Sequence, residues 1–119
     1  MTMDLRQRAL SERVRIGREA LAAAAPFNGA LQDWHSQIAR LRVLANRSGK
    51  APDAHDDLRE EADMLARSVN DQIEAFTEAV TLLPPAVAAN ERITDTEKAL
   101  NQARAAIDTI REILARPSA

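Results

Sequence analysis

Two histidines are the first residues to examine for chemistry, because histidine is both a metal ligand and an acid/base group near neutral pH. Both occur in the pattern Asp-x-His, as Asp33-Trp34-His35 and Asp53-Ala54-His55. Metal ligands on a helix need a spacing of three or four residues, whereas side chains two residues apart diverge. The Glu-x-x-His pattern of di-iron bundles does not occur. We therefore interpret both histidines as surface or flanking residues and predict no metal site.

Carboxylates crowd the segment between residues 56 and 78, several of them four residues apart. Acid/base catalysis needs such groups in a partly apolar cleft, where their pKa values diverge. Here most of them project away from the apolar face of the same segment, so we predict a solvated acidic stripe. The spaced pairs are Asp56 and Glu60, Asp57 and Glu61, and Glu74 and Glu78.

Nucleophiles and phosphate loops are equally unsupported. The chain has no cysteine, and its serines lack the Gly-x-Ser-x-Gly and Ser-x-x-Lys contexts of hydrolases. Ser48-Gly49-Lys50 is too short for a phosphate-binding loop. We therefore predict a protein that is not an enzyme and that has no cofactor.

Charge is divided unevenly along the chain. Residues 1–50 contain nine Lys/Arg against four Asp/Glu, and residues 51–119 contain seven against fourteen. One interpretation is that two oppositely charged halves of the same bundle pack together. The other is that the basic half presents a face to an acidic partner.

The elements that position these groups are predicted to be helices. The chain has 119 residues, only three glycines and 45% hydrophobic residues, which is typical of one helical domain, residues 1–119. MTMDLRQRAL lacks the apolar core of a signal peptide, and no apolar run approaches the roughly 20 residues that span a bilayer. We expect a cytoplasmic protein with no membrane contact.

Two apolar stripes run along residues 4–25. The first comprises Leu10, Val14, Gly17, Leu21 and Ala24, and the second comprises Leu5, Ala9, Ile16, Ala20 and Ala23. Both are predicted to contact neighbouring helices. Arg6 and Arg13 fall between the stripes, and we expect Asp71 or Asp63 as their partners if they are buried.

Pro26 raises the main question of architecture. A stripe from Ile16 to Ile38 stays in phase through the proline, which allows one continuous helix. Against this, an interior proline costs about 3 kcal/mol and Gly29 about 1 kcal/mol more. A helix of that length would also exceed a compact domain of this size. We predict a helical hairpin, with a second helix over 27–47.

The remainder of the chain predicts two further helices. NRSGKAPD, residues 46–53, is a break in which Gly49 suits a left-handed cap. Residues 54–83 follow, and Pro84-Pro85 ends them. Thr94 to Glu97 form a capping box that opens the last helix. The predicted fold is an all-α antiparallel bundle of three to four amphipathic helices, at about 4–25, 27–47, 54–83 and 95–115.

Protein–protein recognition is the function that these observations favour. The expected role is that of an adaptor, an inhibitor or an assembly component, whose partner is another protein or its own copies. The alternative is a nucleic-acid-associated protein that uses the arginines of the first half. Against that alternative, the pI is about 5.7 and the aromatic residues fall on core faces. The predicted partner-binding residues are Arg8, Arg15, Arg18, Val43, Met64 and Leu82.

Overall fold

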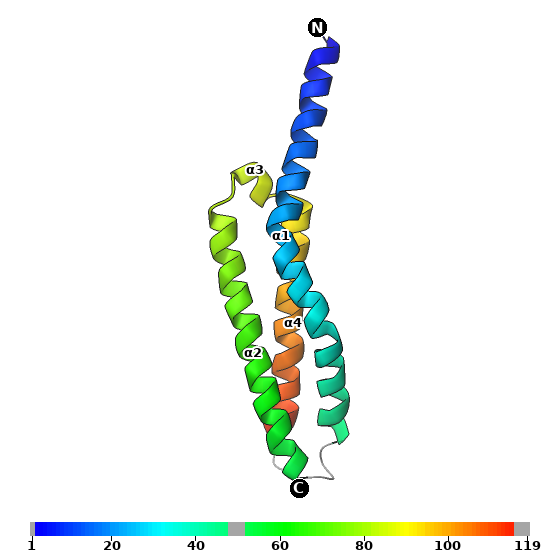
Figure 1. Cartoon of the computed structure of the whole chain (residues 1–119), viewed down its shortest axis with the longest axis vertical. Coiled ribbons are helices and arrows are strands. Elements are labelled where there is room, and N and C mark those ends of the chain that lie inside the picture. Colours follow the sequence, from blue (N-terminus) through cyan, green and yellow to red (C-terminus); the bar gives the residue numbers. More distant parts are fainter. Residues whose placement is uncertain (1, 48–51, 116–119) are drawn as a thin grey trace.

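The computed structural model is an elongated all-α bundle of 75 × 22 × 18 Å, which confirms the predicted fold class (Figure 1). The structure describes residues 2–47 and 52–115, with the side chains of residues 4–47 and 55–115. Over these ranges the helices are α1 (Thr2–Arg47), α2 (Pro52–Thr81), α3 (Pro85–Ala88) and α4 (Glu91–Ala115). The cap expected at Gly49 lies outside the described residues.

The three long helices run down, up and down in the order of the chain (Figure 1). α2 is antiparallel to both α1 and α4, and the short α3 turns the chain between α2 and α4. α4 packs extensively on both α1 and α2, whereas α1 and α2 touch each other far less. The last helix of the chain therefore holds the bundle together.

α1 is one continuous helix of 46 residues with Pro26 inside it, so the predicted hairpin is wrong. The helix changes direction in its middle but does not break (Figure 1). Pro26 itself faces solvent, while Ala24 and Phe27 on either side of it are buried. The stripe from Ile16 to Ile38 thus remains on one face, and its burial outweighs the local cost of the proline.

The hydrophobic core confirms most of the predicted apolar faces. Phe27 of α1 and Phe76 of α2 meet edge to face, with ring centroids 5.1 Å apart. Trp34, Leu41, Leu58, Val69, Leu100, Ile107, Ile110 and Leu114 are all buried. One predicted face is wrong, because Leu10, Val14 and Leu21 are exposed, and of that stripe only Ala24 is fully buried. The second stripe is wrong at Leu5 and Ala9, which are exposed, and holds from Ile16 onward.

α4 begins at Glu91, earlier than the capping box at Thr94 to Glu97 predicted. Asn90 caps the helix instead, since its Oδ1 accepts a hydrogen bond from the backbone N–H of Arg92 at 3.0 Å. Thr96 is buried inside α4, where its Oγ1 lies 2.9 Å from the carbonyl oxygen of Arg92. The same Oγ1 lies 3.1 Å from the side-chain amide of Asn28, which ties α4 to α1 just after the proline.

Replacing the helix-interior proline should stabilise the protein. Pro26→Ala restores a backbone N–H that can bond to the carbonyl of Ala22, so we expect the free energy of unfolding to rise by about 1–3 kcal/mol. Urea denaturation followed by circular dichroism measures this. Gly29→Ala is the control without a proline: a Cβ there meets nothing within 4 Å, and we expect a gain of about 1 kcal/mol. Destabilisation by Pro26→Ala alone would mean that the bend is required for packing.

Candidate functional site: the projecting arm of α1

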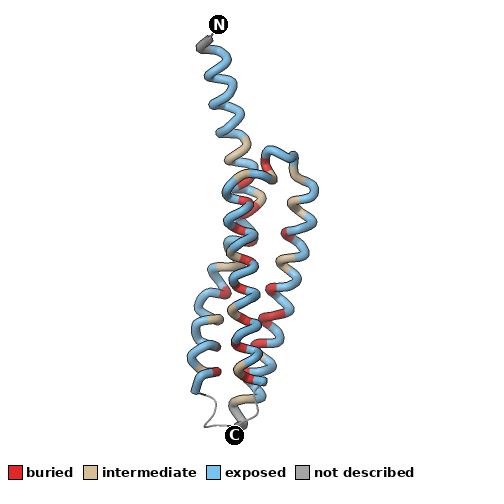
Figure 2. Tube along the Cα trace, turned by 180° about the vertical axis from the view of Figure 1, so that it is seen from behind, coloured by how far each residue is buried: buried red, intermediate tan, exposed pale blue. Residues whose placement is uncertain are grey.

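The first part of α1 extends beyond the α3 end of the bundle without any covering element (Figure 1). Every residue from Asp4 to Arg15 is exposed, and partial burial begins only at Ile16 (Figure 2). We call residues 4–15 the arm. Its twelve residues span about 17 Å at 1.5 Å per residue.

Large apolar side chains on the arm are open to solvent. Leu5, Leu10 and Val14 are exposed to 66%, 59% and 52%. Leu10 and Val14 are one turn apart and continue toward Leu21, which is 48% exposed. An isolated helix shorter than about 12–15 residues is marginal in water, so an amphipathic arm of this kind gains stability when a partner covers its apolar face.

The arm is also basic, and most of its cations lack an internal partner. Arg15 forms ion pairs with Glu12 and, at 3.5 Å, with Glu19. The hydrogen bond that the guanidinium donates to Glu12 and the charges of both carboxylates raise the pKa of Arg15 above its ordinary value. Within the part of the chain that the structure describes, Arg6, Arg8 and Arg13 form no ion pair.

The carboxylate partners of Arg6 and Arg13 were expected only if these arginines are buried, and neither is. Both arginines are exposed on the arm, far from a core that would require neutralisation. Asp63 instead accepts a hydrogen bond from Nε of Arg111 on α4 at 2.9 Å, and Asp71 is exposed without an ion pair among the described residues.

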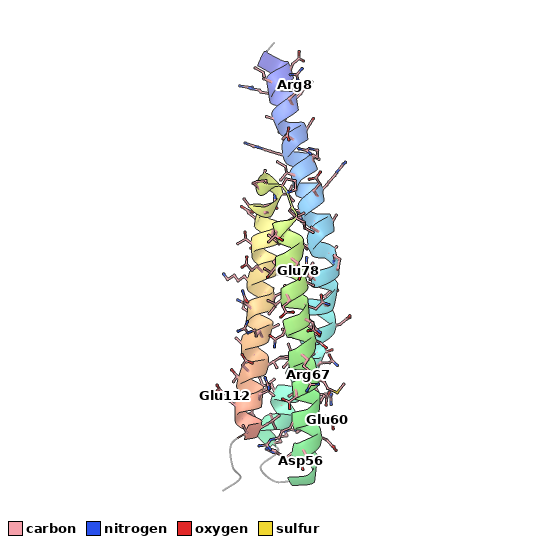
Figure 3. The ribbon with its side chains drawn as sticks, turned by 90° about the vertical axis from the view of Figure 1, so that its left-hand side faces the viewer. Arg8, Asp56, Glu60, Arg67, Glu78 and Glu112 are labelled. Carbon is pink, nitrogen blue, oxygen red and sulfur yellow. The ribbon has the colours of Figure 1, made fainter. Side chains whose placement is uncertain are left out.

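The outer side of α2 carries the opposite charge. Asp56, Glu60 and Glu78 project from α2 away from its neighbours, with Arg67 among them (Figure 3). The predicted solvated acidic stripe is confirmed for these residues and for Asp71 and Glu74, which are all exposed. Glu61 is the exception: it is half-buried and pairs with Arg40 of α1.

The six residues predicted to bind a partner are all exposed but do not form one surface. Arg8 and Arg15 lie on the arm, and Arg18 lies just below it. Leu82 directly follows α2 at the same end of the bundle and is 86% exposed. Val43 lies near the C-terminal end of α1 and Met64 in the N-terminal half of α2, and both are exposed. Leu5, Leu10 and Val14 were not predicted as site residues, because their spacing indicated a buried face.

The histidines have different environments. His35 is exposed, as predicted, whereas His55 is half-buried. Nε2 of His55 contacts the carbonyl oxygen of Leu114, to which Nε of Arg59 also donates at 2.9 Å. These two α2 side chains thus satisfy a terminal carbonyl of α4, which is a structural role. Over residues 4–47 and 55–115 no group of three or more His, Asp or Glu residues could hold a metal ion.

A groove lies between the lower ends of α2 and α4, lined by Arg59, Asp63, Asp108, Arg111 and Glu112. Its charges are of both signs, two arginines against three carboxylates, and include the Arg111–Asp63 pair, so its net charge is only −1. The arm differs in this respect, because its unpaired charges are all cations except Asp4.

Comparisons with protein-family models, with curated proteins and with solved structures found no match. Within the described ranges, no helix combines the length and the apolar character that crossing a bilayer requires. The cytoplasmic location and the absence of enzymatic activity stay predictions.

The arm should contribute almost nothing to the stability of the isolated bundle. Replacing Leu10 and Val14 together by Ala removes side chains that already contact water, so we expect the free energy of unfolding to change by less than about 0.5 kcal/mol. Ile107→Ala, in the core, should cost about 2–5 kcal/mol. Urea titration compares the variants, and a large loss for the arm variant would show that its side chains are covered in solution.

Proposed function

We propose that this protein acts through protein–protein contacts, as an adaptor, inhibitor or assembly component without enzymatic activity, and that the arm of α1 is its main contact element. The observation that carries the proposal is the exposure of Leu5, Leu10 and Val14 on a helix that projects from a well-packed bundle. Leu10 and Val14 lie one turn apart beside charged residues, and apolar residues in such a setting are typical of helix-mediated interfaces.

A protein partner is favoured over a nucleic acid by the chemistry of the exposed side chains. All three aromatic residues, Phe27, Trp34 and Phe76, are buried, so none is available to stack on a base. Phosphates would use the arginines of the arm but leave Leu10 and Val14 in water. A partner helix covers both kinds of side chain.

Affinity capture from a lysate of the source cells tests the proposal. We expect the wild-type chain to retain a discrete protein after nuclease treatment and in high salt, because burial of apolar area is insensitive to screening. Leu10→Asp combined with Val14→Asp should abolish this retention. The matched control is Val43→Asp, which alters an equally exposed apolar residue of the same helix outside the arm.

Two outcomes would contradict the proposal. Equal retention by the wild-type chain and the arm variant would show that the arm is not the contact element. Recovery that disappears with nuclease would replace the protein partner by a nucleic acid bound through the arginines.

A further inference from the structure

The arm and the outer face of α2 have complementary charges, most of which form no ion pair among the residues that the structure describes. From Asp4 to Arg18 there are five arginines against two carboxylates, and from Pro52 to Thr81 there are nine carboxylates against two arginines. We propose that two copies of this chain associate, with the arm of each copy lying along the C-terminal half of α2 of the other. This inference rests on the proposed function and names the partner.

Internal ion pairs leave both surfaces largely unused. Over residues 55–81, two carboxylates of α2 have internal partners: Glu61 pairs with Arg40 of α1, and Asp63 pairs with Arg111 of α4. No ion pair among the described residues uses the exposed carboxylates Asp71, Glu74 and Glu78. Because the arm projects past the α3 end, its arginines do not lie against α2 of their own chain (Figure 1).

The two surfaces also agree in length and apolar content. Residues 4–15 of the arm and residues 71–81 at the end of α2 each extend about 17 Å along a helix. Ala75 is exposed on that part of α2, between Asp71 and Glu78, and Leu82 is exposed directly after it. Leu10 and Val14 on the arm offer apolar side chains to them, with Arg13 and Arg18 on the flanks of these two residues at about 100° per residue.

The geometry permits a closed dimer. The arm leaves the bundle at the α3 end, and residues 71–81 of α2 lie at that same end (Figures 1 and 3). When two bundles meet by their α3 ends around a two-fold axis, each arm points along the partner's α2. The contact is then made twice, and no surface is left to extend a polymer.

Pairing of one arm with another arm is the less favourable alternative. Each segment from Asp4 to Arg18 has a net charge of +3, so two of them side by side would repel. By contrast, the carboxylates on the acidic face of α2 attract the arginines of the segment that have no internal partner. The second copy's α2, rather than its arm, is therefore the partner surface that we assign.

A charge-exchange experiment tests the dimer. Sedimentation equilibrium at low salt compares wild type, Arg13→Glu with Arg18→Glu, Glu74→Lys with Glu78→Lys, and the chain carrying all four changes. We expect wild type to dimerise, and each pair of changes alone to weaken dimerisation about tenfold or more. The chain carrying all four changes should dimerise with an affinity within about threefold of wild type, because every contact regains an opposite charge.

The matched control reverses two other arginines of α1, as Arg42→Glu with Arg47→Glu. Both are exposed and lie outside the arm, so this variant should dimerise like wild type. Circular dichroism confirms that each variant remains folded, which is expected because all the altered residues are exposed.

The results separate this inference from the proposed function. The proposed dimer is overturned if the wild type is monomeric. It is also overturned if the chain with all four changes dimerises no more tightly than the two double variants. If capture of a different protein still requires Leu10 and Val14, the proposed function stands with an external acidic partner. If the wild type is monomeric and capture is also independent of the arm, both fail.

Discussion

The packing of α1 along α4 is the constraint on which the rest of the structure depends. Burying an apolar side chain fully contributes about 1.5–3 kcal/mol, and the stripe from Ile16 to Ile38 contains several such residues. The sum exceeds the roughly 3 kcal/mol that an interior proline costs. The helix therefore continues through Pro26, and the local penalty appears as a bend rather than as a turn.

The arm follows from a difference in helix length. At 1.5 Å per residue, the 46 residues of α1 extend about 69 Å, whereas the 30 residues of α2 extend about 45 Å. The surplus of about 24 Å has no neighbour within the chain and must project. The apolar residues of that surplus are exposed because the other helices end, not because their own pattern differs from that of the core.

The buried faces of α2 and α4 could be predicted because helical periodicity is a local property of the sequence. Val69 and Ile107 can be assigned to a buried face without knowing which helix packs against them. The continuity of α1 could not, because the cost of Pro26 is local while the compensating burial depends on α4. The same reason applies to the arm: Leu5 and Ile16 lie on one stripe and are both apolar, and the extent of the neighbouring helices leaves Leu5 exposed while Ile16 is partly buried. The acidic face of α2 was predictable, since a charge run on a helix is usually solvated.

The central position of α4 has a consequence for biosynthesis. α1 and α2 touch each other little, and each buries its apolar face mainly against the last long helix. During synthesis at about 5–20 residues per second, these faces have no partner until α4 has been made. The bundle therefore cannot mature before α4 has been synthesised. Until α4 is complete, the apolar faces of residues 1–90 must not associate with other molecules. These are the same faces that later form the core.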